Sequence, residues 1–481
     1  MWESFCTFSP NRAGIGVSFF PLIVYNGDEI PVGWLKEACA AAWPTRCGTG
    51  FHGADPVLDR EHNTKGWSLM NAFLPANILI PQVDSMEKWA VIACDQFTSD
   101  PAYWARVAET AGDAPSTLRL ILPEAELGTP QEAAHTEEIN RTMEAYLASG
   151  LFRTYENSFV YVERTLQNGS VRKGLVGMVD LDAYDYNPGS TSAIRATEKT
   201  VTERIPPRQR VRRNASMELP HILLLCDDDR KVLLEPIGAK KESLTKLYDF
   251  DLMEDGGHIT GYLVSGDEAA AFEDRLTAYT AACPEKYRDL PGTSLVFAVG
   301  DGNHSLATAK SCYEELKAKN PGVDLSNHPA RYALVELENI HDEAQQFEPI
   351  HRVVVDTDPE SLLAALEPWC APEGYPITWY AGEKTGTVYL DRSRSQLEVG
   401  VLQQFLDEYL AAHPGKIDYI HGDEDLKNLA RQDRAIGFLL PAMAKSQLFR
   451  GVVADGVLPR KTFSMGHARE KRYYLEGRTI K

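Results

Sequence analysis

The chain has 481 residues, of which 43% are hydrophobic and 25% are charged, so it suits two or three folded domains and a largely disordered protein is excluded. Its formal net charge of -20 argues against binding nucleic acid through a broad basic surface, because phosphate contacts need clustered Lys and Arg. A local pocket for a small anion remains compatible with this charge.

The cysteines indicate a reducing compartment. The 8 Cys include no CxxC pair, so zinc-type spacing is absent, and a disulfide framework does not suit a chain of this length. The most apolar stretch near the N-terminus, residues 16–25, is interrupted by Pro21 and lacks the flanks of a signal peptide. We therefore expect a cytoplasmic protein without a membrane span.

Residues 1–69 differ from the rest of the chain. They contain Trp2, Trp34, Trp43 and Trp67, which are half of all tryptophans, and show little periodicity. Two interpretations stay open: an irregular N-terminal extension, or upstream sequence that precedes a natural start at Met70.

From residue 70 onward strand and helix patterns alternate. Asn168-Gly169 is a strong hairpin signal between two apolar runs. Strands are predicted over 89–94, 118–122, 159–162, 174–179, 221–226, 295–299 and 435–440, and helices from Pro101 and over 136–147, 267–279, 306–317 and 401–412. The pattern predicts a mixed α/β (α+β) fold with a main α/β domain over 70–345 and a C-terminal α+β domain over 346–481.

The best candidate site is the segment Gly300-Asp301-Gly302-Asn303-His304-Ser305, which follows an apolar strand. Glycines let the backbone turn tightly, and the N-terminus of the following helix presents free amides to an oxyanion. Asp301 could hold a divalent cation or accept a hydroxyl proton, and His304 could stabilise charge or transfer a proton. A plain turn with a capping Asn303 is the alternative interpretation.

Four segments in the same order resemble one family, the bacterial domain of unknown function 1015. The box at Gly300–Ser305 is similar to its Asp-Gly-His-His-Arg motif, and three more segments match its other motifs, namely residues 194–200, 347–354 and 458–463. Together they span residues 70–481 and leave residues 1–69 outside the resemblance.

The box also resembles that of the ParB/sulfiredoxin-like fold, which includes free serine kinases. The resemblance implies a ParB/sulfiredoxin-like core with inserted and C-terminal α+β elements. It also implies a phosphate held by Gly300, Gly302, Asn303 and Ser305. Since Ser305 replaces the arginine of the motif, Arg195, Arg352 or Lys461 would have to supply the missing positive charge.

The resemblance implies catalysis by Asp95, Asp301 and His304, with Mg²⁺ bound at Asp301. The leading hypothesis is therefore a small-molecule phosphotransferase, acting on L-serine or O-phosphoserine with pyrophosphate or a nucleoside diphosphate. A non-catalytic regulator that binds a nucleotide or phosphometabolite is the alternative. The expected partner is a small anionic or amino-acid substrate, with no nucleic acid and no membrane.

Several charged segments are predicted to be structural. The basic run 204–213 is interpreted as a solvated loop or strand edge, and 467–472 as a solvated charged run. Arg195 and Glu198 are expected to form a salt bridge, and His351 to satisfy a buried carbonyl.

Overall fold

The computed structural model describes residues 72–92, 97, 100–123, 126, 128–200, 205–466 and 468–481. Contacts divide the chain into Met1–Gly66 and Trp67–Lys481, and every described residue lies in the second unit. The predictions for residues 1–69 and for Asp95 lie outside the described residues. The boundary between residues 345 and 346 stays a prediction.

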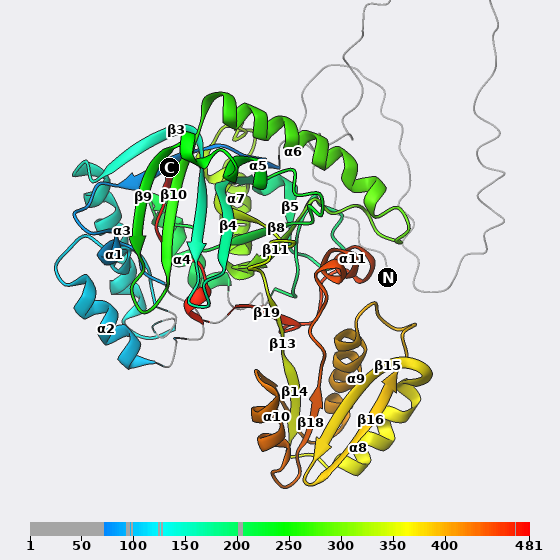
Figure 1. Ribbon diagram of the computed structural model, residues 1–481. Coiled ribbons are helices and arrows are strands. Elements are labelled where there is room, and N and C mark those ends of the chain that lie inside the picture. The colour runs from blue at the N-terminus through cyan, green and yellow to red at the C-terminus, as the bar shows by residue number, and fades with distance from the viewer. Residues whose placement is uncertain are drawn as a thin grey trace, which may run out of the picture. The chain divides into compact units, whose positions relative to one another are not determined.

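A mixed sheet of eleven strands forms the largest element among the described residues, in the order β5-β6-β11-β8-β12-β4-β3-β10-β9 with β1 on β4 and β2 on β3 (Figure 1). Its strands are β1 (Phe73–Leu74), β2 (Ala76–Pro81), β3 (Phe152–Thr165), β4 (Val171–Asp180), β5 (Tyr184–Asp185), β6 (Ile194–Ala196), β8 (Leu223–Cys226), β9 (Thr245–Asp251), β10 (His258–Val264), β11 (Phe297–Asp301) and β12 (Tyr332–Asn339). The mixed α/β class is confirmed.

A second sheet of five strands follows, in the order β16-β15-β18-β14-β17 (Figure 1). Its strands are β14 (His351–Val355), β15 (Cys370–Ala381), β16 (Lys384–Leu390), β17 (Lys416–Ile420) and β18 (Ile436–Leu439), and two short pairs join β13 (Phe347–Pro349) to β19 (Phe463–Met465) and β7 (Met217–Glu218) to β20 (Arg478–Thr479).

The described helices are α1 (Met86–Trp89), α2 (Pro101–Ala111), α3 (Glu132–Ala148), α4 (Ile205–Asn214), α5 (Glu235–Gly238), α6 (Gly266–Lys286), α7 (Asn303–Lys319), α8 (Pro359–Leu366), α9 (Glu398–Ala412), α10 (Asp423–Ala430) and α11 (Lys445–Asp455). Within the described part of the chain, no helix combines the length and apolarity that crossing a bilayer requires.

Apolar side chains of the two sheets share one core. Leu223 and Leu225 of β8 are buried in the same cluster as Val354 of β14 and Phe438 of β18. On the other face of β8, Leu224 packs with residues of α6 and α7. The alternation of side chains along β8 therefore contributes to two cores, as expected for a central strand.

The C-terminal segment of the chain returns to strand β2 of the eleven-stranded sheet. Gly477 exchanges two backbone hydrogen bonds with Leu79, and the indole of Trp89 donates to the carbonyl of Leu475. This path brings residues 468–481 back beside segments near residue 80.

Most predicted elements are confirmed. The hairpin forms at Gly169, whose φ of 81° requires a glycine-like conformation, and Asp100 caps α2 through the amide of Tyr103. The strands predicted at 221–226, 295–299 and 435–440 and the helices at 136–147, 267–279, 306–317 and 401–412 all form.

Three predictions of local structure were wrong. Residues 86–89 form a helical turn capped by Ser85, and Val91 makes only one isolated bridge, to Tyr474. Residues 117–120 form a 3₁₀ turn capped by Ser116 rather than a strand. The described part of the basic run is helix α4, because Pro206 and Pro207 suit the first turn of a helix.

Candidate functional site

The strand–loop–helix element at the centre of the site depends on two glycines. Gly302 has a φ of 77° and joins β11 to α7, and a Cβ there would lie 3.0 Å from the Cα of Ile222. A Cβ on Gly300 would lie 2.7 Å from the sulfur of Met465 and 2.9 Å from the side chain of Leu225. Gly302 is thus required by its conformation, and Gly300 by close packing.

All six residues from Gly300 to Ser305 line a cavity of about 580 Å³. Seven basic residues also line it against three acidic residues, although the whole chain carries a charge of -20. The basic residues are Lys199, Arg208, Arg212, Arg460, Lys461, Lys471 and Arg472, and the acidic residues are Glu198, Glu218 and Asp301. This local excess of positive charge suits an anionic ligand.

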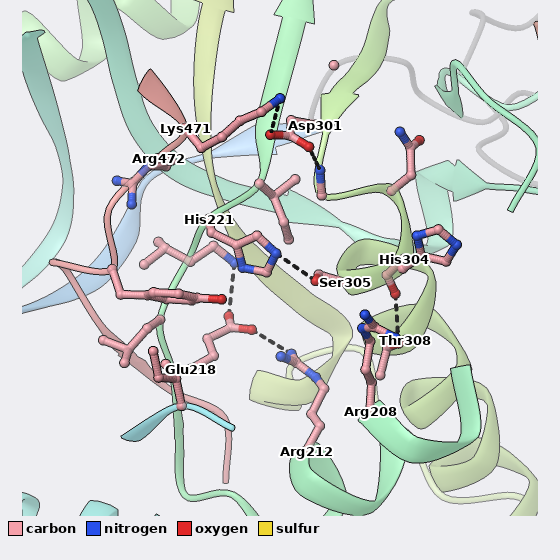
Figure 2. A pocket seen from close by; sticks show the side chains of 18 of the residues that line it. Arg208, Arg212, Glu218, His221, Asp301, His304, Ser305, Thr308, Lys471 and Arg472 are labelled. Atoms are coloured by element: carbon pink, nitrogen blue, oxygen red, sulfur yellow. Dashed lines mark hydrogen bonds and ion pairs between the residues drawn. The ribbon is translucent and has the colours of Figure 1, made fainter. Parts of the chain in front are cut away.

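Asp301 stays ionised in this cavity. Its Oδ2 lies 3.1 Å from the Nζ of Lys471, and its Oδ1 accepts the amide of Gly302 at 2.8 Å (Figure 2). Burial opposes ionisation, but Lys471 and the amide of Gly302 outweigh it and lower the pKa of Asp301. The carboxylate is therefore a fixed negative charge at the end of β11.

Glu198 has the opposite electrostatic environment. Burial raises the pKa of its carboxyl to about 7, and the charge of Asp301 adds to this effect while Lys461 opposes it. One oxygen accepts the amide of Lys461 at 3.1 Å. A group that exchanges a proton near neutral pH is suited to general acid–base chemistry.

The predicted salt bridge between Arg195 and Glu198 was wrong. Arg195 instead donates to Ser192, Thr293 and Ser294, and it does not line the cavity. Its guanidinium is used to hold the loop before β11, so the structure does not bring it to the box as a phosphate ligand.

Arg352 is also placed differently from its predicted role. The side chain is fully buried and donates to the carbonyls of Lys461 at 2.9 Å and Arg460 at 3.2 Å, and to Oε1 of Gln403 at 3.1 Å. It does not line the cavity. Arg352 therefore holds the backbone of the loop whose side chains, Arg460 and Lys461, do line it.

Lys461 is the predicted cation that the structure places in the cavity. Its φ of 58° is unusual for a residue with a Cβ, and its backbone is held on both sides, through its amide by Glu198 and through its carbonyl by Arg352. Such a conformation persists only where the surroundings fix it, which is frequent at functional sites.

Helix α4 adds a basic wall that the sequence interpretation missed. Arg208 and Arg212 both line the cavity. Arg212 pairs with Glu218 at 2.5 Å, and Glu218 also pairs with Arg478 at 2.6 Å. Within a helix, residues four apart face the same side, so a helical interpretation of the basic run could have predicted that these two arginines act together.

Two further cavity residues lacked a clear sequence signal. His221 lies just before β8, and its Nε2 is 2.8 Å from the Oγ of Ser305 on α7, 84 residues further along the chain.

Lys471 reaches Asp301 because the chain end folds back. The prediction of a solvated run over 467–472 was wrong for Lys471 and for Arg472, which is buried between Glu336 and Glu476. His467 lies outside the described residues.

Three other predicted residues lie in or beyond the cavity. His304 and Asn303 line the cavity, and the Oδ1 of Asn303 is buried without a hydrogen-bond partner. His351 is buried, where its Nδ1 accepts the amide of Leu440 and its Nε2 lies 3.1 Å from Asp423. The predicted carbonyl partner was wrong, because the partners of His351 are an amide and a carboxylate.

One family model matches the chain, over residues 76–438, and its description is "Protein of unknown function (DUF1015)". No curated protein matches. The match covers most of the chain and includes the box at Gly300–Ser305.

Solved structures show only weak similarity. A conserved hypothetical protein from Pyrococcus furiosus has a TM-score of 0.29 and 14% identity, covering 62% of this chain and 90% of that chain. A free serine kinase in complex with AMP has a TM-score of 0.29 and 12% identity, covering 63% and 90%. SbnI with C-terminal truncation, from Staphylococcus aureus, has a TM-score of 0.32 and 12% identity, covering 60% and 83%. At these scores the chemistry of the cavity rests on its own residues.

Proposed function

The chain belongs to the DUF1015 family of proteins of unknown function, and we propose that its cavity binds a phosphorylated small molecule and transfers the phosphoryl group to a hydroxyl acceptor. One observation carries this proposal. A helix N-terminus, an excess of basic side chains and two carboxyl groups with opposite pKa shifts line one cavity. Phosphoryl transfer needs mainly positioning and charge neutralisation, which such an arrangement supplies.

The phosphate end of the cavity is proposed to be the start of α7. The helix begins inside the box, at Asn303, and the positive end of its dipole favours an anion there. Lys461 and Arg208 line the same cavity, one on the loop before β19 and one on α4. We therefore propose that Lys461 and Arg208 supply the positive charge at the phosphate, and that the predicted Arg195 and Arg352 do not.

The two carboxyl groups suggest a division of roles. Glu198 is the proposed base, because a pKa of about 7 lets it accept the proton of an attacking hydroxyl at neutral pH. Asp301 remains ionised, and its proposed role is to orient the acceptor. Asp95 stays a prediction.

A resident Mg²⁺ does not fit the described residues well. Both oxygens of Asp301 already have partners, Lys471 and the amide of Gly302. Among the described residues no group of three potential acidic, His or Cys ligands is present. Mg²⁺ is therefore proposed only as an ion that arrives with the phosphates of the substrate, as is common for this metal.

The substrates proposed first are those that the motif resemblance implies: L-serine as acceptor, with pyrophosphate or a nucleoside diphosphate as donor. A cavity of about 580 Å³ falls in the range of small-molecule sites and has room for donor and acceptor together. A non-catalytic protein that only binds a phosphometabolite is the second candidate, favoured by the same cavity if turnover is absent.

The test is turnover. The full chain is incubated with L-serine, Mg²⁺ and each of pyrophosphate, ADP and ATP, and phosphoserine is measured in both directions. We expect transfer that falls about 100-fold or more in Asp301→Asn. The matched control is Asp433→Asn, an exposed carboxylate outside the cavity, which should leave transfer unchanged. Binding without turnover would support the second candidate, and absence of both binding and turnover would contradict the proposal.

A further inference from the structure

A serine and a histidine in the cavity are arranged for covalent chemistry. We propose that Ser305 is a nucleophile that takes up the transferred phosphoryl group, with His221 as the base that accepts its hydroxyl proton. This inference rests on the proposed function and deepens it, because it makes the transfer a two-step reaction through a phosphorylated enzyme.

The geometry is that of a nucleophile and its base. The Oγ of Ser305 lies 2.8 Å from the Nε2 of His221, and the two side chains point toward each other (Figure 2). Both line the cavity, so a donor phosphate bound there can reach the hydroxyl. Hydrogen-bond contact between nucleophile and base is the arrangement that activates a serine.

The surroundings keep the imidazole of His221 unprotonated. Desolvation lowers the pKa of its imidazole to about 4, with Arg208 and Arg472 acting in the same direction and Asp301 opposing them. The ring is therefore neutral at neutral pH, and its Nε2 can accept from the hydroxyl when Nδ1 carries the proton. The carboxylate of Asp301 then stabilises the imidazolium that forms during transfer.

The start of α7 places the positive end of a helix dipole where the reaction places negative charge. Ser305 is the third residue of α7, so a phosphoryl group that approaches its hydroxyl also meets the positive end of the helix dipole. Lys461 and Arg208 line the same cavity. These groups stabilise the charged oxygens of the phosphoryl group as it moves between partners.

The two steps balance. In the first, Ser305 Oγ bonds to the donor phosphorus, its proton moves to His221 Nε2, and the leaving phosphate departs with the electrons of the broken P–O bond. In the second, the acceptor hydroxyl attacks the phosphoseryl phosphorus and gives its proton to Glu198. Ser305 leaves with the electrons of its P–O bond and regains the proton from His221.

A fluorophosphonate probe tests the nucleophile without any assumption about the substrate. Ser305 Oγ would bond to phosphorus, fluoride would leave with the electrons of the P–F bond, and the proton would pass to His221. We expect one adduct per chain, mapped to Ser305 by mass spectrometry. Ser305→Ala should abolish it, and His221→Gln should slow labelling about 100-fold or more.

Ser311→Ala is the matched control, since Ser311 lies on the same helix outside the cavity and accepts a hydrogen bond from Gln209. It should label like the unchanged protein. Circular dichroism verifies that each variant is folded. Absence of an adduct at Ser305 in the unchanged chain, or equal labelling of folded His221→Gln, would overturn the inference.

A second arm separates this inference from the proposed function. The chain is mixed with pyrophosphate or ADP and Mg²⁺ but no acceptor, and phosphorylation of Ser305 is measured. A phosphorylated Ser305 supports the intermediate. Wild-type transfer rates in Ser305→Ala would overturn the intermediate and leave phosphoryl transfer standing. Probe labelling that depends on His221, without any phosphoryl transfer, would support the nucleophile and contradict the proposed function.

Discussion

Glu198 and Asp301 line the same cavity, yet their environments act on them in opposite directions. Burial dominates at Glu198, whereas Lys471 and nearby donors outweigh burial at Asp301. Proteins commonly assign acid and base roles by separating pKa values in this way. At the scale of single residues, this pair is why we propose acid–base chemistry in the cavity in addition to anion binding.

The first prediction concerns the pH dependence of transfer. Since the base must be ionised, kcat/KM should rise as pH increases through about 7, the pKa of Glu198. Glu198→Gln should remove this rise and lower kcat by about 100-fold or more. Steady-state kinetics between about pH 5 and about pH 9 measure both effects. A rise near pH 7 that persists in the folded variant would contradict the assignment.

The same residue gives a prediction for stability. An unfolded Glu loses its proton near 4.5, while folded Glu198 keeps it up to about 7, so the folded state binds more protons between these values. Stability should therefore fall as pH rises from 4.5 to 7 and stay lower above that range. Glu198→Gln should remove this loss. Thermal melts of both proteins at acidic and alkaline pH measure it, and equal pH profiles would contradict it.

At the scale of elements, the loop before β19 links the five-stranded sheet to the cavity. Arg352 on β14 holds the carbonyls of Arg460 and Lys461. Its guanidinium also lies 4.9 Å from the ring centre of Tyr419 on β17. A change in the second sheet can therefore alter the position of two cations in the cavity.

This contact predicts the effect of Arg352→Lys. A lysine cannot make the forked hydrogen bonds of the guanidinium, so the buried carbonyls lose partners and the loop loosens. We expect a loss of about 1–3 kcal/mol in unfolding free energy and a higher KM for the phosphorylated substrate. Denaturant unfolding and kinetics measure the two effects.

The matched control is Arg431→Lys, an exposed arginine, which should change stability by less than about 0.5 kcal/mol. A positioning role for Arg352 predicts that KM changes more than kcat in the folded variant. Lower stability with an unchanged KM would indicate a purely structural residue.

Elements with strong local signals could be predicted from the sequence. The strand, glycine loop and helix around Asp301 follow from apolar periodicity and the placement of glycine, and so does the hairpin at Gly169. The roles of Arg195 and Arg352 could not be predicted this way, because their carbonyl partners are fixed by tertiary packing. No local pattern indicates that Lys471 reaches Asp301 or that His221 reaches Ser305.

At the scale of the molecule, residues 468–481 connect the cavity to strand β2 of the eleven-stranded sheet. Lys471 contacts Asp301, and the next residue, Arg472, is buried against Glu336 and Glu476. A buried ion pair that loses one partner leaves an uncompensated charge.

Removing residues 472–481 should therefore destabilise the whole described unit rather than only its end. The deletion leaves Glu336 and Glu218 without Arg472 and Arg478, and we expect a loss of about 3–5 kcal/mol or more. Lys481→Ala, at an exposed end position, is the control. A truncated chain with an unchanged melting temperature would contradict this prediction.

The central claim is that this acidic protein binds phosphate groups in one basic cavity, and calorimetric titration with pyrophosphate tests it most directly. We predict saturable binding to the full chain, weakened about 10-fold or more in Arg208→Ala and in Lys461→Ala, since a hydrogen bond to a charged group contributes about 1.5–3 kcal/mol. Asp433→Asn should bind as the unchanged chain does. Absence of binding of both pyrophosphate and ADP, or binding that neither cavity variant weakens, would contradict the claim.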